Sequence, residues 1–585
     1  MPVAAASPAA PRTTGQPGTG GAGTARPDPV AWLIALATFA AYTTLSVARY
    51  QRLNPGSWDL GIYTQYVRQL AHLHAPVVAI RGPGFNLLGD HFQPIVALVA
   101  PFFRLFPTPV TLLVAQALLT SVSVVPVCRA ARDRLGTAVS RVIGAAYGFS
   151  WGLQQMIIFD FHEIAFAVPL LACSLSALVR RRPRAAAAWA LPLVFVKEDQ
   201  GLTVAVIGLV MIALAAGAWV RRRQQPAGPP PAAADPAMAG AGPGDAAGPG
   251  DGARPGDGAE AGAVAGAGAG VWAGAGAVLV LWGLGWSALA IAVIIPHFNP
   301  AHHYMYWSDG GVISPGLGHI PAGGLLAQLA HAGPVKLRTT VLVLLPVAFL
   351  ALRSPLAASA VPGLALRFLS TNSTFWGTQW HYSATLMPIA FVAAIDGLAR
   401  IQARAARRQA GAASASRRAG PPWSRAWAAK QEASAARSQA PAAMTGPPGG
   451  RAARYAAVAM AAIAALLAFG FPLAGLWSPR TYRVTPHVRA EREALALIPA
   501  GTTVESTLTM LAPLAARDRA TWIGTAGNPV PRYVAYDADN SGFAHPPADV
   551  PGFVNSRYPG VTYRTIFKAD GVYLFRRTAN RDGTR

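Results

Sequence analysis

The sequence predicts an all-α polytopic membrane protein with a small α/β domain at its C-terminal end. The 585-residue chain is 52% hydrophobic and only 13% charged, which is too apolar for an ordinary water-soluble protein of this length. Several apolar runs approach the roughly 20 residues that a helix needs to cross a bilayer. The last 110 or so residues lack such runs and instead show short strand-like segments punctuated by glycine and proline.

The net charge of +24 follows the pattern of a membrane protein rather than a nucleic-acid-binding one. Arginines gather beside apolar segments at 180–184, at 221–223 and throughout 400–454, as in cytoplasmic loops. No aromatic or glycine-containing recognition motif accompanies the charge. We therefore expect the lipid bilayer, and no nucleic acid, as a partner. Cys128 and Cys173 define neither a disulfide framework nor a zinc motif.

Alternation and the distribution of arginine give about eleven transmembrane helices and a cytoplasmic N-terminus. The predicted spans are 29–48, 107–128, 139–158, 162–179, 185–196, 201–219, 271–295, 339–352, 356–370, 382–399 and 455–475. The apolar stretch 91–106 contains Pro94, Pro101 and Arg104 and suits a re-entrant or interfacial helix better. Counting it as a span would place the arginine clusters outside.

Composition divides the chain further. We expect a disordered tail at 1–28, a first membrane half at 29–223 with an outer loop at 49–106, a disordered cytoplasmic linker at 224–270, a second membrane half at 271–399, a basic cytoplasmic linker at 400–454, a last span at 455–475 and an extracytoplasmic domain at 476–585. In that domain, a helix is predicted at 488–497 and strands at 503–506, 533–536, 561–567 and 572–576.

The polar chemistry lies at the ends of the spans opposite the arginine clusters. All twelve histidines and the main acidic motifs fall there. The candidate site residues are Asp59, Asp90, His91, Asp160, His162, Glu163, Lys197, Glu198, Asp199, Arg367, His381 and Tyr382. Ionisable groups at a membrane boundary are costly unless they are solvated or paired, and they often line a functional cavity.

Each motif also has a structural interpretation. Asp59 can act as a general base or metal ligand, or simply cap a helix. Lys197 and Glu198 can line a water-filled cavity or form a buried pair. Arg367 can hold a lipid phosphate or extend to the interface. The histidine-rich loop at 297–303 matches no strict metal motif, so the sequence leaves open whether a divalent metal is required.

Together these motifs resemble the membrane-protein family known as domain of unknown function 2079. The resemblance extends over most of the chain outside the linkers and the N-terminal tail. It rests on Asp59-Leu60-Gly61 with Gln65, His91-Phe92 with Pro94, Ala100-Pro101, Gln116, Phe161-His162-Glu163, Lys197-Glu198-Asp199, His381-Tyr382 with Pro388, and the stretch 494–504.

That family is similar to the C-type (GT-C) glycosyltransferases, which take a sugar from a polyprenyl-phosphate carrier on the outer face of the membrane. The resemblance implies a GT-C-like fold and a catalytic role for Asp59. It also implies that Lys197 and Arg367 bind the carrier phosphate, while the other candidate residues line the cavity. The alternatives are a membrane transporter or flippase, whose ion path would use the intramembrane charges, and a non-catalytic envelope protein on the same fold.

Overall fold

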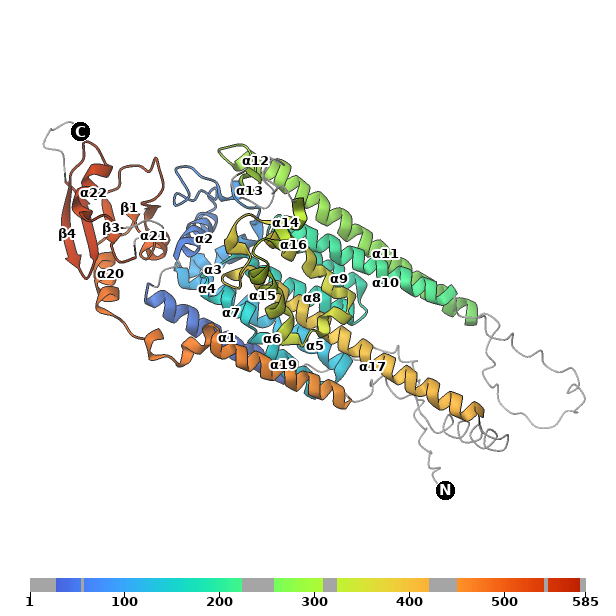
Figure 1. Cartoon of the computed structure of the whole chain (residues 1–585). Helices are drawn as coiled ribbons and strands as arrows, with labels where there is room; N and C mark the ends of the chain where they lie inside the picture. Colours follow the sequence, from blue (N-terminus) through green and yellow to red (C-terminus); the bar gives the residue numbers. More distant parts are fainter. Residues whose placement is uncertain are drawn as a thin grey trace, which may run out of the picture.

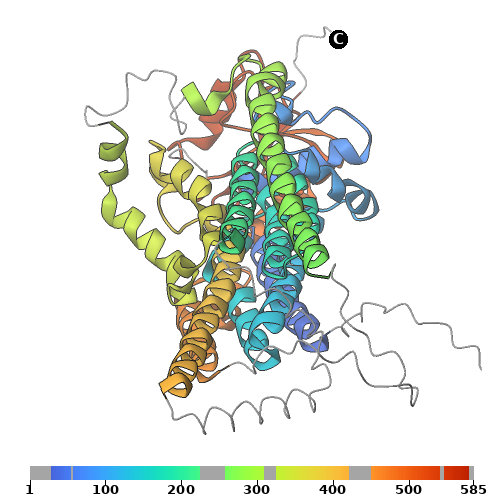
Figure 2. The same ribbon diagram turned by 90° about the vertical axis from the view of Figure 1, so that its right-hand side faces the viewer.

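The computed structural model describes residues 28–53, 57–223, 257–308, 324–419, 450–540 and 546–578. Long helices run side by side in an elongated bundle, and a small sheet with its own helices lies at one end of it (Figures 1 and 2). We call this small unit, residues 486–578, the sheet domain, and the end of the bundle that carries it the sheet end. The predicted tail at 1–27 lies outside the described residues.

Among the described residues, six helical segments are long and apolar enough to cross a membrane: Pro29–Gln51, Pro109–Leu135, Gln200–Val220, Gly268–Phe298, His381–Gln409 and Arg451–Gly470. They correspond to six of the predicted spans. The helices within them are α1 (Pro29–Gln51), α4 (Pro109–Val122), α5 (Val124–Leu135), α10 (Gln200–Arg223), α11 (Asp257–Leu289), α12 (Ile295–Phe298), α17 (Leu386–Ala419) and α19 (Arg451–Gly470). The side chain of Asp28 caps α1 by accepting a hydrogen bond from the Val30 amide.

The other five predicted spans correspond to shorter or interrupted helices, so the count of eleven stays a prediction. These are α6 (Thr137–Gly148), α7 (Trp151–Ile158), α8 (Ala167–Val179), α9 (Pro183–Ala190), α15 (Gly333–Leu344) and α16 (Val361–Leu369), with 3₁₀ turns at Glu163–Phe166, Leu191–Phe195, Leu345–Val347, Leu350–Arg353 and Pro355–Ala360. The stretch expected to be re-entrant forms a 3₁₀ turn at Pro94–Val99 and α3 (Ala100–Leu105). This apolar segment is too short to span a bilayer.

Two predicted linker boundaries differ from the structure. Helix α11 begins at Asp257, inside the predicted linker 224–270, and α17 continues to Ala419, inside the predicted linker 400–454. The extension of α17 is rich in alanine and arginine, which favour helix, whereas that of α11 alternates alanine with glycine, and its helix is not explained by propensity. Residues 224–256 and 420–449 lie outside the described residues.

Several short helices and turns connect the longer ones. They are α2 (Ser57–Ala71), α13 (Met305–Ser308) and α14 (Gly324–Ala330), with 3₁₀ turns at Leu87–Gly89, Ser373–Phe375, His381–Ser383, Pro472–Trp477 and Pro479–Thr481 and a π turn at Ala290–Ile294.

Helices α10 and α11 pack through glycines. A Cβ atom added at Gly201 or Gly283 would overlap the carbonyl oxygen of the other glycine, and Gly208 and Gly276 face each other in the same way. Small residues let two membrane helices approach until their backbones touch, and this close packing replaces the missing hydrophobic driving force. The α10–α11 pair carries Lys197–Asp199 and Ser287 at its sheet end, so this contact helps to position the site described below.

We expect Gly283→Val to lower the stability of the purified protein by about 1–3 kcal/mol, because overpacking forces the two helices apart. Gly285→Val is the matched control, since no atom lies within 4 Å of its Cβ position. Both substitutions change helix propensity equally, so only the steric clash distinguishes them. Thermal unfolding in detergent measures the difference. Equal midpoints for the two variants would contradict the proposed role of this contact.

The sheet domain is an α/β unit, as predicted. Its strands are β1 (Thr503–Ser506), β2 (Arg519–Trp522), β3 (Tyr533–Asp537), β4 (Tyr563–Ala569) and β5 (Val572–Arg577), in the order β2-β1-β3-β5-β4. Strand β1 is parallel to β2 and β3, whereas β5 is antiparallel to β3 and β4. Its helices are α20 (Pro486–Ala496), α21 (Leu511–Arg517) and α22 (Val550–Arg557). Helix α20 and strands β1, β3, β4 and β5 were predicted from the sequence, whereas β2, α21 and α22 were not.

The sheet domain is attached to helix α2. The Gln65 amide donates to the carbonyl oxygen of Ala520 (2.6 Å), and Arg68 donates to that of Asp518 (2.7 Å). The Thr525 hydroxyl donates to the carbonyl oxygen of Ile80 (2.9 Å) in the loop after α2. These contacts fix α2, the first element after helix α1, against the rest of the sheet end.

Candidate functional site

A cavity of about 350 Å³ lies at the sheet end of the helical bundle. Its walls come from α2, the loop after α2, the starts of α8 and α10, the end of α11, helix α16 and the segment before α17. The predicted site residues that line it are Asp59, Asp90, His91, His162, Lys197, Glu198, Asp199, Arg367, His381 and Tyr382. Residues more than 300 positions apart in the sequence therefore meet in one space.

Glu163 does not line the cavity itself, but it contacts three residues that do. Its carboxylate is fully buried. It contacts the Lys197 ammonium (Oε1 to Nζ, 3.3 Å) and His162 Nδ1 (2.6 Å) and accepts a hydrogen bond from the Tyr63 hydroxyl. The His162 ring in turn stacks on His381, with centroids 3.5 Å apart. A buried carboxylate is stable only when such partners compensate its lost hydration.

Glu198 forms a second network in the cavity wall. Its Oε1 contacts His91 Nδ1 (2.7 Å) and accepts from the Tyr304 hydroxyl (2.8 Å), while Oε2 accepts from the Phe92 amide (3.1 Å). Burial alone would favour the neutral acid, but the His91 ring lowers the pKa of Glu198 to about 2. Glu198 is thus an ionised carboxylate that ties the start of α10 to the loop after α2.

The Asp90 carboxylate also has side-chain partners. Its Oδ1 pairs with Arg81 Nη2 (3.0 Å) and accepts a hydrogen bond from the Tyr306 hydroxyl (3.1 Å). The Tyr306 ring stacks on His91, with centroids 4.4 Å apart. The segment 304–306 therefore contacts both Glu198, through Tyr304, and Asp90, through Tyr306.

Asp59 differs from these acids because it makes no hydrogen bond or ion pair with any described residue. Helix α2 begins at Ser57, so Asp59 lies inside the first turn rather than capping the helix from the preceding position. Burial raises the pKa of this carboxyl, and the nearby Glu163 carboxylate adds to the shift against the opposing effect of His162. A half-buried carboxylate without a partner, at the edge of a cavity, has its oxygens available to a ligand.

Arg367 is buried, and most of its donors go to its own neighbourhood. Nε donates to the carbonyl oxygen of Phe375 (2.8 Å), Nη2 to that of Gly377 (2.7 Å) and Nη1 to the Ser383 hydroxyl (3.2 Å). No carboxylate among the described residues pairs with it. The guanidinium thus shapes the loop between α16 and α17 and also leaves a positive charge at the cavity wall.

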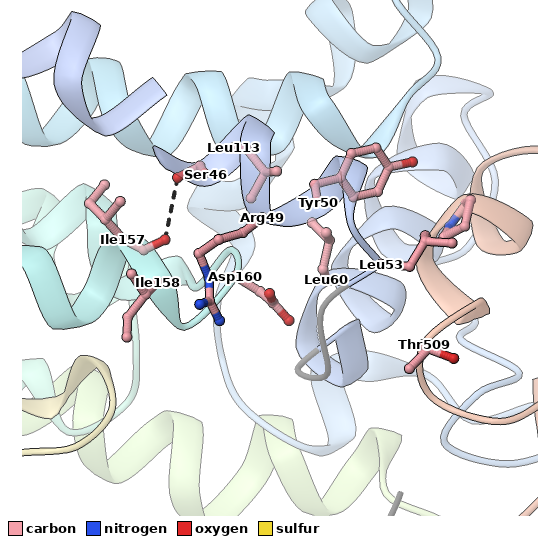
Figure 3. A pocket seen from close by; sticks show the side chains of 11 residues that line it. Ser46, Arg49, Tyr50, Leu53, Leu60, Leu113, Ile157, Ile158, Asp160 and Thr509 are labelled. Carbon is pink, nitrogen blue, oxygen red and sulfur yellow. Dashed lines mark hydrogen bonds between the residues drawn. The ribbon is translucent and has the colours of Figure 1, made fainter. Parts of the chain in front are cut away.

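Asp160 was expected to line the same cavity, but the structure places it elsewhere. It lines a separate small pocket with Arg49, Ser46 and Thr509 (Figure 3). The backbone of Asp160 is left-handed (φ 72°), and this turn directs its side chain away from that of His162. Asp160 is therefore not a cavity residue, although it precedes His162 by only two positions.

Other cavity residues were not predicted: Arg81, Tyr63, Gln93, Tyr304 and Tyr306. The Tyr63 hydroxyl donates to Gln93 Oε1 (2.7 Å) as well as contacting Glu163. Its position four residues after Asp59 in α2 was an available signal, because residues at i and i+4 share one face of a helix. Arg81, Gln93 and Tyr304 lie in irregular segments and Tyr306 in the four-residue helix α13, and neither setting has a periodicity that indicates direction.

The bundle, its six membrane-length helices and the polar cavity at one end define a polytopic membrane protein with a candidate ligand site. The chain belongs to the family described as predicted membrane protein (DUF2079), which matches residues 49–417. The recognition of this family from its motifs is thereby confirmed.

Comparison with curated proteins gives no match. Among solved structures, the chain is similar to the crystal structure of ArnT from Cupriavidus metallidurans bound to undecaprenyl phosphate. The TM-score is 0.45 and the sequence identity 13%, over 95% of this chain and 100% of that chain. A likeness this weak assigns no function.

Proposed function

We propose that this protein is a GT-C-like membrane glycosyltransferase that moves a sugar from a polyprenyl-phosphate carrier to an acceptor hydroxyl, on the face of the membrane that carries the sheet domain. The observation that carries the proposal is the pairing state of Asp59. It is a carboxylate without a partner among the described residues, in a cavity whose other acids, Asp90, Glu198 and Asp199, each pair or hydrogen-bond with a neighbouring side chain. A transferase needs one such free base beside its substrate.

The composition of the cavity suits a lipid-linked sugar phosphate. Arg367 and Lys197 place positive charge on its wall, and charge-assisted hydrogen bonds from such groups bind phosphate oxygens. Its apolar wall includes Leu202 of α10, Ile291 of the π turn that follows α11, and Leu366 of α16. Val293 of the same π turn and Val361 of α16 are exposed. We expect a polyprenyl chain to enter from the bilayer between this π turn and α16.

The chemistry follows from these positions. Asp59 takes the proton of the acceptor hydroxyl as its oxygen attacks the anomeric carbon of the sugar. The bond from that carbon to the carrier phosphate breaks, and the polyprenyl phosphate leaves with the electron pair. Lys197 and Arg367 stabilise the negative charge that the leaving phosphate gains. The raised pKa of Asp59 makes it a stronger base than an exposed carboxylate.

Two measurements test the proposal. First, glycoconjugates and lipid-linked sugars are profiled in a deletion strain and in the wild type. Second, the purified full-length protein is incubated in liposomes with a radiolabelled polyprenyl-phosphate sugar and candidate acceptors. We expect a missing glycoconjugate in the deletion strain and transfer of label in vitro. An unchanged profile in the deletion strain would rule out the transferase.

The buried charges Glu163, Lys197 and Glu198 also suit an ion or substrate path, which favours a transporter as the second candidate. The liposome assay separates the two functions. Movement of labelled lipid or solute across the bilayer without transfer of the sugar would replace the transferase by a transporter or flippase.

A further inference from the structure

A second cluster of ionisable side chains lies in the sheet domain, apart from the cavity. His487 and Glu491 are one turn apart on α20, and Asp537 is the last residue of β3. Their ligand atoms all lie within 4.8 Å of one another. Asp537 and Glu491 are buried, whereas the His487 side chain is 20% exposed and reaches solvent.

The tautomer of His487 leaves one ring nitrogen available. Nδ1 lies 2.6 Å from the carbonyl oxygen of Asp570, and because a carbonyl only accepts, Nδ1 carries the hydrogen. In the neutral ring the lone pair is then on Nε2, which faces Asp537 Oδ2 (3.3 Å) and Glu491 Oε1 (4.0 Å); in the protonated ring Nε2 donates to Asp537 Oδ2 instead. A histidine that ligates a metal through one nitrogen commonly donates the other N–H to a carbonyl or carboxylate.

The carboxylates of Asp537 and Glu491 differ in the hydrogen bonds that they accept. Asp537 Oδ1 accepts hydrogen bonds from the amides of Asp539 (2.9 Å) and Asn540 (3.0 Å), and Oδ2 accepts from the Thr509 hydroxyl (3.0 Å). Glu491 Oε1 is fully buried and accepts no hydrogen bond from the described residues. A buried acceptor atom without a donor, 4.0 Å from His487 Nε2 and beside a second carboxylate, is a place where a cation would compensate the lost hydration.

We propose that His487, Glu491 and Asp537 bind a divalent transition-metal ion of the zinc or manganese class. Ligands about 2.0–2.2 Å from one such ion lie roughly 3–4 Å from each other, which agrees with the two separations from His487 Nε2. One imidazole and two carboxylates form a donor set for these ions and exclude calcium, which takes oxygen ligands only.

The ion would join α20 to the end of β3 and, through the carbonyl oxygen of Asp570, to the turn between β4 and β5. Helix α20 is the first element of the sheet domain after the last membrane-length helix, α19. The site thus lies where the sheet domain begins, and the metal is expected to stabilise that domain. This inference is independent of the proposed transferase activity, because no cavity residue takes part.

The test uses the full-length protein, purified in detergent without a histidine tag, stripped with EDTA and equilibrated with ZnCl₂. Bound zinc is measured by elemental analysis and affinity by calorimetry. We expect the wild type to hold one zinc ion more than Glu491→Gln or Asp537→Asn, or to bind it at least about tenfold more tightly. Glu493→Gln is the matched control: the same substitution on an exposed face of α20. It should behave like the wild type, and CaCl₂ should not compete.

Thermal unfolding is a second measurement, for the case that a variant of a buried ligand fails to fold. His487→Gln is used here because His487 is the most exposed of the three ligands. Zinc should raise the thermal midpoint of the wild type and of Glu493→Gln but not that of His487→Gln. The cluster would be an ion-paired network without a metal if the wild type, His487→Gln and Glu491→Gln retain equal zinc and show equal midpoints. That result would overturn the proposal.

Discussion

Replacing Asp59 by asparagine is expected to lower the rate of sugar transfer by about 10²–10⁴-fold, the usual contribution of a positioned general base. Asparagine keeps the size of the side chain but cannot accept the proton of the acceptor hydroxyl. The fold should be unaffected, because Asp59 makes no hydrogen bond or ion pair with the described residues. The assay is the initial rate of label transfer in liposomes at saturating carrier.

The control for this prediction is Asp133→Asn, the same substitution at an acid outside the cavity that pairs with Arg132 and Arg180. It should leave transfer within a few-fold of wild type. Binding of the carrier lipid gives a second measure, since Asp59→Asn should retain it. If Asp59→Asn transfers sugar at the wild-type rate, Asp59 is not the base, even if the protein is a transferase.

The parts of the fold that composition and periodicity determine could be read from the sequence. The six membrane-length helical segments overlap their predicted positions, although several of their ends differ, and strand β1 at Thr503–Ser506 has its predicted bounds. The common placement of the site residues was also accessible, because alternating spans bring every second loop to the same end of the bundle. His91, Glu198 and His381 were assigned to one face on that basis, and the cavity brings them together.

The direction of individual side chains could not be read in this way. Asp160 and His162 are two residues apart, yet one left-handed backbone position separates their side chains into different pockets. Aspartate tolerates that conformation, so the sequence permits the turn without requiring it. The engagement of Arg367 with loop carbonyls depends on how residues 370–383 fold back, and that is a tertiary property.

The three-residue cluster in the sheet domain could not be predicted from the sequence either. His487 and Glu491 have the i, i+4 spacing that places two side chains on one helical face. Their third partner, Asp537, lies 46 positions further on from Glu491, at the end of a strand. Only the packing of α20 on the sheet brings the three ligand atoms together.

Breaking the pair of Lys197 with Glu163 is expected to have the largest effect on stability. Lys197→Met removes the cation beside a carboxylate that is 0% exposed. The carboxylate keeps His162 and Tyr63 but loses its one lysine or arginine partner among the described residues. Removing one member of a buried ion pair typically costs about 3–5 kcal/mol, because the remaining charge is left uncompensated. Thermal unfolding in detergent, at a fixed scan rate, should show a midpoint several degrees below that of the wild type.

The double variant Glu163→Gln/Lys197→Met separates this cause from a general loss of packing. It removes both charges, so no uncompensated carboxylate remains. Replacing a buried ion pair by neutral groups is often close to neutral in stability, and we therefore expect the double variant to be more stable than Lys197→Met alone. Coupling between contacting residues commonly amounts to about 0.5–3 kcal/mol. A double variant at least as unstable as the sum of the two single ones would mean that the lost charge pairing is not the cause, because additive losses indicate that the two side chains act independently.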